Sequence, residues 1–177
     1  MKKVCFVGVR NIFFEKALLK FLTDYIYVSE NEVKIGSLNS NGLLIYDTGG
    51  YFKDIGTDFE AIVFKNDFFE PFEYRSRIKS RCIVFLTEGC SRVARKLDSL
   101  GIRYNVCGVE RTCGITPSSI TEDSMTVSLR SVVTSSGKLI CEEDEFRIKG
   151  LFNVYNICPA MIGSAMERII CGYNFAR

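Results

Sequence analysis

The sequence predicts an α/β domain in which a mainly parallel sheet is flanked by helices, with an antiparallel β extension before the last helix. Up to Gly108, short apolar runs alternate with amphipathic segments, which is typical of a parallel sheet. After Gly108, strand-like runs follow one another with only turn residues between them. The chain of 177 residues is long enough for one domain with a sizeable core. We therefore expect residues 1–177 to form a single domain.

The parallel part is predicted from short apolar runs separated by helical patterns. Lys3–Val7 ends at Gly8, and apolar residues then recur at helical spacing over Phe13–Leu22. Cys82–Leu86 is a continuous apolar run, as expected for a strand covered on both faces. The other elements expected here are the strands Tyr25–Val28, Val33–Ile35, Leu43–Tyr46, Ala61–Phe64 and Arg103–Val106, the helix Cys90–Leu100, and a partly helical charged segment, Asp67–Lys79.

The last third of the chain has a different pattern. Gly114–Ile120, Met125–Val133 and Lys138–Cys141 alternate or run apolar between turns, which predicts an antiparallel meander. A final helix is predicted over Asn156–Cys171, where apolar residues recur on one face.

Composition narrows the range of functions. The net charge of +2 gives no reason to expect a nucleic-acid partner, which usually requires a concentrated basic face. No apolar stretch approaches about 18 residues and no signal peptide is recognisable, so we expect a cytoplasmic protein without a membrane segment. Histidine is absent and the eight cysteines contain no C-x-x-C pair, so we expect no metal site and interpret most cysteines as buried apolar residues.

One motif stands at the start of the last helix. It reads Gly150-Leu151-Phe152-Asn153-Val154-Tyr155-Asn156 and is followed by Ala160. This motif resembles the end of the central ATP-binding domain of Mur ligases, the amino-acid-adding enzymes of bacterial peptidoglycan synthesis. In that family the pattern is G-[RK]-[FH]-N-[VL]-x-N-A-L-A-A. The family's order of a parallel sheet, a small meander and a helix is also similar. The resemblance implies a P-loop-like fold, and contact of Asn156 with the adenine of ATP. The alternative, which we favour, is that Asn153 and Asn156 cap the helix.

The phosphate loop that this resemblance implies is altered. The family has G-T-N-G-K-[TS]-[TS] after the first strand, where this chain has Gly8-Val9-Arg10-Asn11-Ile12-Phe13-Phe14. Such a loop works through glycine-rich backbone, a lysine that reaches the phosphates and a hydroxyl that binds magnesium. Ile12 replaces the lysine, and Phe13 and Phe14 replace the hydroxyls. Arg10 could still meet an anion at the helix start.

Other residues expected from the resemblance are also missing. After Ala61–Phe64 the family has a glutamate that binds magnesium, whereas this chain continues with Lys65-Asn66-Asp67. We expect Asp67 to cap the helix that follows. No catalytic residue is predicted, and the residues that could retain some nucleotide binding are Gly8, Arg10, Asn11, Asn153 and Asn156. We expect that the protein needs no cofactor. If the chain is instead a subunit of an active ligase, it would require ATP and magnesium.

The leading hypothesis is a non-catalytic, stand-alone Mur-ligase-like domain without the family's flanking substrate-binding and carboxy-terminal domains. It would bind a protein partner, a small ligand or a second copy of itself, in a cell-wall context. The alternatives are a subunit of a split ATP-dependent ligase and a Rossmann-like nucleotide-binding domain. A nucleophilic thiol at Cys90, at a predicted helix start, is a further candidate. The aromatic residues that could form an interface are Phe13, Phe14, Phe68, Phe69, Phe72 and Tyr74.

Overall fold

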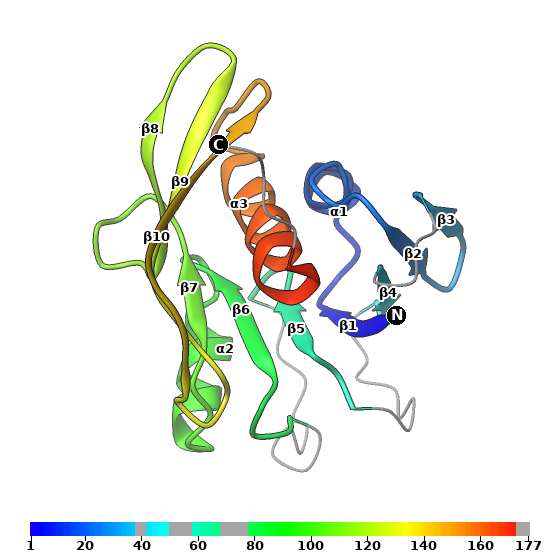
Figure 1. Ribbon diagram of the computed structural model, residues 1–177. Coiled ribbons are helices and arrows are strands. Elements are labelled where there is room, and N and C mark those ends of the chain that lie inside the picture. The colour runs from blue at the N-terminus through cyan, green and yellow to red at the C-terminus, as the bar shows by residue number, and fades with distance from the viewer. Residues whose placement is uncertain (38–41, 50–57, 68–77, 173–177) are drawn as a thin grey trace.

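The computed structural model of the protein describes residues 1–37, 42–49, 58–67 and 78–172. Ten strands form one sheet in the order β10-β9-β8-β7-β6-β5-β1-β4-β2-β3 (Figure 1). Most of the predicted segment Asp67–Lys79, with its four aromatic residues, lies outside the described residues. The strands are β1 (Lys2–Val7), β2 (Tyr25–Val28), β3 (Val33–Ile35), β4 (Leu43–Asp47), β5 (Ala61–Phe64), β6 (Ile83–Thr87), β7 (Asn105–Cys107), β8 (Ile115–Ile120), β9 (Ser124–Val133) and β10 (Leu139–Lys149).

The sheet is parallel through its middle and antiparallel at both ends. β1 lies between β4 and β5 and is parallel to both, and the parallel pairing continues through β6 and β7 to β8. β3 is antiparallel to β2, while β9 is antiparallel to β8 and β10. The predicted α/β class and the antiparallel extension are therefore confirmed. The carboxyl ends of β4, β1 and β5 meet at one edge of the sheet, which positions the site described below.

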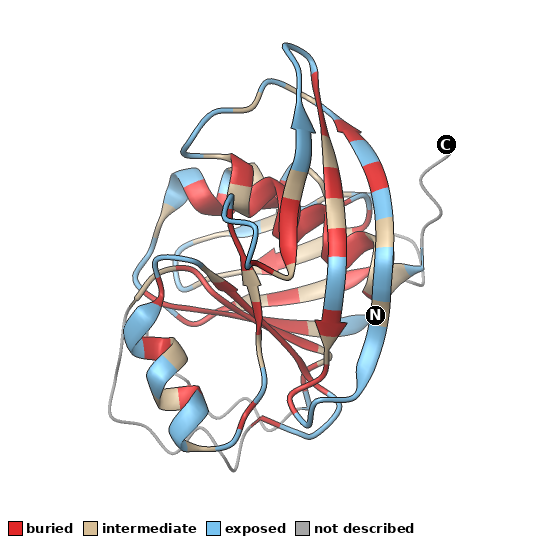
Figure 2. Ribbon diagram, turned by 90° about the vertical axis from the view of Figure 1, so that its left-hand side faces the viewer, coloured by how far each residue is buried: buried red, intermediate tan, exposed pale blue. Residues whose placement is uncertain are grey.

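Helices cover both faces of the sheet. α1 (Ile12–Leu19) and α3 (Ile157–Met166) lie side by side on one face, and α2 (Ser91–Ser99) lies on the other (Figure 1). Side chains of β1 alternate between the two resulting cores, with Val4 and Phe6 in the core beneath α1 and α3, and Cys5 and Val7 in the core beneath α2. α3 is almost entirely buried, whereas α2 buries only a stripe (Figure 2).

The structure corrects three predicted boundaries. β10 was expected to end at Cys141 but continues to Lys149, because it pairs with β9 along its length although its sequence is rich in Glu and Asp. α1 ends at Leu19 rather than Leu22. The last helix changes at Glu167–Cys171 into a π-helical turn.

The cysteines expected in the core are buried there, since Cys5, Cys82 and Cys107 are each at most 1% exposed. Burial also raises the pKa of the Cys82 thiol to about 12, as expected for a sulfur kept from water. Among the helices of the described residues, none is long and apolar enough to cross a membrane.

A glycine allows α1 and α3 to approach closely. Gly163 lies in α3 with its backbone against α1, and a Cβ atom there would be 2.5 Å from the carbonyl oxygen of Leu18. The obstructing atom belongs to the backbone, so the two helices would have to separate to accept a side chain.

We predict that Gly163→Ala lowers the free energy of unfolding by about 1–3 kcal/mol, because the added methyl group overpacks this helix contact. Chemical denaturation measures the change. Gly89→Ala is the matched control, since a Cβ atom at Gly89 would meet nothing within 4 Å. Equal stability of the two variants would contradict a close contact between α1 and α3.

Candidate functional site

The loop between β1 and α1 is closed by a side chain from the neighbouring strand connection. Gly8 has a φ of +123°, a conformation that favours glycine. A Cβ atom at Gly8 would lie 2.7 Å from Oδ1 of Asn66. Asn66 Nδ2 in turn donates a hydrogen bond to the Val9 carbonyl oxygen at 2.9 Å. Asn66 therefore packs directly against the backbone that forms the cradle in a phosphate loop.

Asn11 is the N-cap of α1. Its Oδ1 accepts a hydrogen bond from the Phe14 amide at 3.1 Å, and its own amide donates to Oε1 of Glu15 at 2.9 Å. This reciprocal pair is close to a capping box and satisfies the amides of the first turn. Asn11 therefore has a structural role that the sequence interpretation, which grouped it with nucleotide-binding residues, did not include.

The residues in place of the loop hydroxyls have opposite environments. Phe13 is 82% exposed, whereas Phe14 is buried in the core between the sheet and α3. Ile12 is also exposed, at 44%. Neither phenylalanine supplies a polar atom to the loop.

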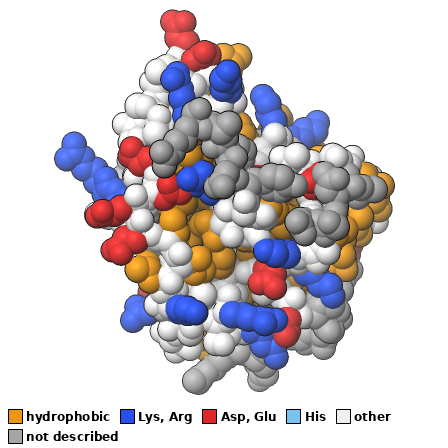
Figure 3. All heavy atoms as spheres, in the orientation of Figure 1, with side chains coloured by type: hydrophobic (Ala, Val, Ile, Leu, Met, Phe, Trp, Pro, Cys, Tyr) orange, Lys and Arg blue, Asp and Glu red, His pale blue; other side chains and the backbone are white. Residues whose placement is uncertain are grey.

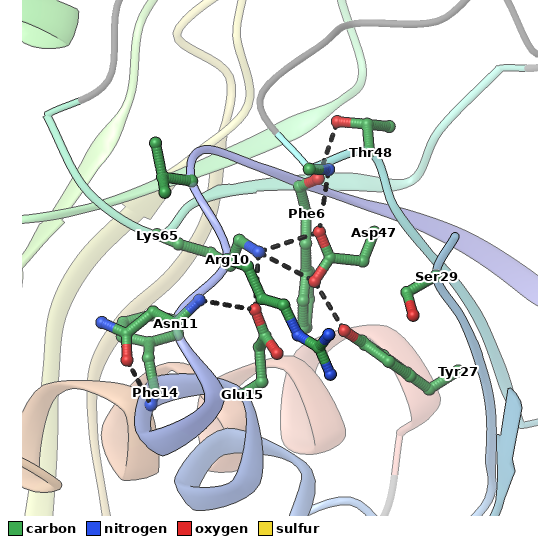
Figure 4. A network of polar contacts seen from close by, with 12 residues as sticks. Phe6, Arg10, Asn11, Phe14, Glu15, Tyr27, Ser29, Asp47, Thr48 and Lys65 are labelled. Atoms are coloured by element: carbon green, nitrogen blue, oxygen red, sulfur yellow. Dashed lines mark hydrogen bonds and ion pairs between the residues drawn. The ribbon is translucent and has the colours of Figure 1, made fainter. Parts of the chain in front are cut away.

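A buried lysine lies at the edge where β4, β1 and β5 end. Lys65 directly follows β5, and its Nζ donates hydrogen bonds to both Asp47 carboxylate oxygens at 2.8 Å and to Glu15 Oε1 at 2.7 Å (Figure 4). The Lys65 side chain is 0% exposed. Tyr27, from β2, donates its hydroxyl to Asp47 Oδ2 at 2.6 Å. The ammonium group thus joins the end of β5 to β4 and α1, and Asp47 links this group to Tyr27 of β2.

The charges in this cluster are tightly coupled. Burial would raise the pKa of Glu15, but hydrogen bonds from Lys65 and the Asn11 amide, together with the Lys65 charge, hold it below its ordinary value of 4.5. Burial, followed by the hydrogen bond to Asp47, raises the pKa of Tyr27. Within the described residues, Glu15 Oε2 is buried without a hydrogen-bond partner. One ammonium group faces two carboxylates, so the cluster carries excess negative charge.

The sequence interpretation missed this cluster, although its members carried a signal. Asp47 is the last residue of β4 and Lys65 directly follows β5, and residues at the ends of parallel strands converge at the carboxyl edge of a sheet. The prediction looked for a carboxylate after β5. The structure instead places a cation there and brings the carboxylate from the end of β4.

Arg10 is partly exposed and held by an acidic residue. Its Nη2 lies 3.3 Å from Oε1 of Glu32, which also binds Lys34 at 2.7 Å. A cavity of about 130 Å³ opens beside it. That volume is below the roughly 300 Å³ of a typical small-molecule site. The cavity is lined by Arg10, Tyr27, Ser29, Glu30, Asn31, Asp47 and Gly49.

Asp67 caps α2, which lies further along the chain. Its Oδ1 accepts hydrogen bonds from the amides of Arg92 at 2.6 Å and Val93 at 3.1 Å. These amides belong to the first turn of α2, where a carboxylate is favoured by the helix dipole. The segment directly after Asp67, which we expected it to cap, lies outside the described residues.

Asn153 and Asn156 stabilise the turn before α3. Asn156 Oδ1 accepts from the Asn153 amide at 2.8 Å, and Asn156 Nδ2 donates to the Leu151 carbonyl oxygen at 2.9 Å. Asn153 Oδ1 accepts from the Tyr155 amide at 2.9 Å. Asn156 occupies the N-cap position, but its side chain turns back to the preceding residues. The predicted capping by the Asn153 side chain is thus wrong, since both side chains bind within the turn itself.

The candidate nucleophile Cys90 does not have an activated thiol. It occupies the N-cap position of α2 as expected, but it is 2% exposed. Burial raises its pKa, and hydrogen bonds with Thr87 offset this only in part. In the described part of the chain, no three His, Cys, Asp or Glu side chains are grouped so as to hold a metal ion.

No family model matches the chain, and no curated protein sequence matches it.

We predict that Lys65→Met lowers the free energy of unfolding by about 3–5 kcal/mol at neutral pH, because it leaves two buried carboxylates without their cation. Lys34→Met is the matched control, and removing its half-exposed ion pair should cost less than about 1 kcal/mol. Urea denaturation measures both. Similar values for the two variants would contradict the role of Lys65.

Acid should weaken the wild-type cluster. The pKa of Glu15 is lowered in the folded state, so its contribution to stability is present above its ordinary pKa of 4.5 and is lost as pH falls below it. The difference in stability between wild type and Lys65→Met should therefore shrink in acid, where the orphaned carboxylates become protonated. A difference that does not change with pH would contradict the ion pairing.

Proposed function

We propose that this protein is a non-catalytic, Mur-ligase-like domain that binds a protein partner. The buried ammonium group of Lys65 carries this proposal. It lies at the edge of the sheet where the resemblance implies a site for phosphate and magnesium, and it is held there by Asp47 and Glu15.

These residues do not fit a magnesium nucleotide. Asp47 and Glu15 are the carboxylates that could bind a metal ion, but both are hydrogen-bonded to Lys65. The excess negative charge of the cluster would repel a polyphosphate. At the mouth of the loop, Ile12 and Phe13 supply neither a cation nor a hydroxyl group, and Arg10 is paired with Glu32.

The same geometry disfavours the two nucleotide-binding alternatives. A second polypeptide of a split ligase would have to displace Lys65, which is fully enclosed. A Rossmann-like site would need room for a dinucleotide, whereas the cavity beside Arg10 measures about 130 Å³.

Exposed apolar side chains favour a protein partner over a small ligand. The turn before α3 carries three of the most exposed large apolar residues of the described chain, Leu151 at 78%, Val154 at 82% and Tyr155 at 83%. The hydrogen bonds of Asn153 and Asn156 hold this turn in one shape, which lowers the entropic cost of binding. Exposed apolar groups on a rigid turn are typical of an interaction site.

The surrounding surface is consistent with this proposal. On the face shown in Figure 3, hydrophobic side chains are exposed between charged groups of both signs. Such a surface fits a folded protein better than a polyanion. The resemblance to Mur ligases suggests a cytoplasmic partner involved in bacterial cell-wall synthesis.

We predict that ATP with magnesium leaves the thermal unfolding midpoint unchanged. Ile12→Lys combined with Phe13→Ser should not restore binding, because these substitutions leave Lys65 between its two carboxylates. Both exchanges are at exposed positions and should be tolerated. Thermal-shift titration with and without magnesium measures the effect. A magnesium-dependent rise in the midpoint of the wild type would contradict the proposal.

We also predict that a photo-crosslinking amino acid at Val154 captures a specific protein in cells of the source organism. The same group at Arg95, an exposed position on α2, is the matched control. Adducts at Val154 that disappear when Tyr155→Ser is added would support the proposal. The same adducts at both positions, or none at Val154, would contradict it.

A further inference from the structure

The turn that joins β9 to β10 lies against the segment that leads into β6, at the amino edge of the parallel strands (Figure 1). Ser135 donates its amide to the Cys82 carbonyl oxygen at 2.7 Å, and Ser136 donates its amide to the Ser80 carbonyl oxygen at 3.2 Å. The Arg103 amide donates to the Ser135 carbonyl oxygen at 2.8 Å. Hydrogen bonds to two other segments of the chain therefore hold the turn in place.

A cavity of about 450 Å³ opens where the turn meets the segment before β6. This volume lies within the range of roughly 300–1,000 Å³ that is typical of small-molecule sites. The cavity beside Arg10 is smaller, at about 130 Å³. The larger cavity lies at the edge of the sheet opposite to Lys65, so it is a candidate ligand site separate from the buried cluster.

Two cations line this cavity. Arg81 comes from the segment before β6, and Lys138 comes from the turn. Arg81 Nη2 lies 4.0 Å from Oδ2 of Asp58, which is too far for a hydrogen bond. Within the described ranges, no carboxylate lies within 4.0 Å of the Lys138 ammonium group. The N–H groups of both side chains are therefore available to bind an anion.

Hydroxyl groups also line the cavity. Thr134 Oγ1 and Ser136 Oγ lie 3.0 Å apart, so one of them donates a hydrogen bond to the other. Thr134 Oγ1 also accepts from the Lys138 amide at 3.1 Å. Whichever hydroxyl donates within the pair, the proton of the other is left for a ligand. The Ser80 hydroxyl is a further donor in the lining.

The rest of the lining is apolar and selects among anions. Leu139 and Ile140 begin β10 and are 47% and 41% exposed. A phosphate monoester has three terminal oxygens for the guanidinium, ammonium and hydroxyl donors, and an organic group that can cover the apolar side chains. A carboxylate has only two oxygens. A polyphosphate would place a second charged group against Leu139 and Ile140, which is unfavourable.

We propose that this cavity binds a small phosphate monoester with an apolar organic group. The charges of Arg81 and Lys138 balance the phosphate dianion, the hydroxyl groups of the turn donate to its oxygens, and Leu139 and Ile140 contact the organic group. The turn is held by its backbone hydrogen bonds, which lowers the entropic cost of binding. The site shares no residue with the turn before α3, so it does not depend on the proposed protein partner.

Backbone ¹H–¹⁵N spectra of the full-length protein, titrated with phenyl phosphate, test the proposal. We expect saturable shifts at residues 134–138, with a dissociation constant of about 1 mM or lower. Benzoate keeps the ring but replaces the phosphate, and should bind about tenfold more weakly. Inorganic phosphate should also bind more weakly, because it lacks the ring.

Three results of this titration would overturn the proposal. They are the absence of saturable shifts, shifts centred on the loop at residues 8–14 instead of the turn, and binding of benzoate or inorganic phosphate that is as tight as that of phenyl phosphate.

Substitutions test the two cations. Arg81→Gln and Lys138→Gln should each raise the dissociation constant of phenyl phosphate about tenfold, because each removes a charged donor. Arg95→Gln is the matched control, since it removes one positive charge from an exposed position on α2 and should leave the dissociation constant unchanged. A similar increase in all three variants would indicate only a general attraction of anions and would overturn the site. Arg81 and Lys138 are exposed, so their variants should fold, and the wild-type titration remains decisive if one does not.

Discussion

The rest of the structure depends on the burial of one charge, the ammonium group of Lys65. A buried cation is costly unless it is paired and hydrogen-bonded, and here every contact comes from a different element. Asp47 ends β4, Glu15 lies in α1 and Lys65 itself follows β5, so the cluster fixes these elements around β1. Because Glu15 also binds the Asn11 amide, the same network sets where α1 begins.

This constraint bears on the proposal that the domain is Mur-ligase-like but non-catalytic. A strand, a loop and a helix follow one another, and behind the loop the Lys65 ammonium group is hydrogen-bonded to Asp47 and Glu15. A pair of buried charges often contributes little to the net free energy of unfolding. Removing one member of the pair nevertheless lowers stability strongly, because the other charge is then left buried without a partner. We infer that the cluster maintains the arrangement of the strand ends, while the proposed binding of a partner would involve the exposed turn before α3.

Much of the fold could be predicted from the sequence, because both faces of the parallel strands are covered and their residues are therefore continuously apolar. Ala61–Phe64 is the simplest case. The predicted β10 was too short because four of its eleven residues are acidic, and this part of the strand is held by pairing rather than by burial. The site was harder to predict: Lys65 and Glu15 are 50 residues apart, and no local pattern shows that a lysine will turn inward.

The most direct test of the central claim observes the Lys65 ammonium group itself. In a ¹H–¹⁵N spectrum tuned to lysine side chains, exposed ammonium protons exchange too fast with water to be seen, whereas a buried, hydrogen-bonded group is protected. We expect a protected signal that disappears in Lys65→Met and does not shift when ATP and magnesium are added. The absence of such a signal, or its loss on addition of the nucleotide, would contradict a cation fixed between Asp47 and Glu15.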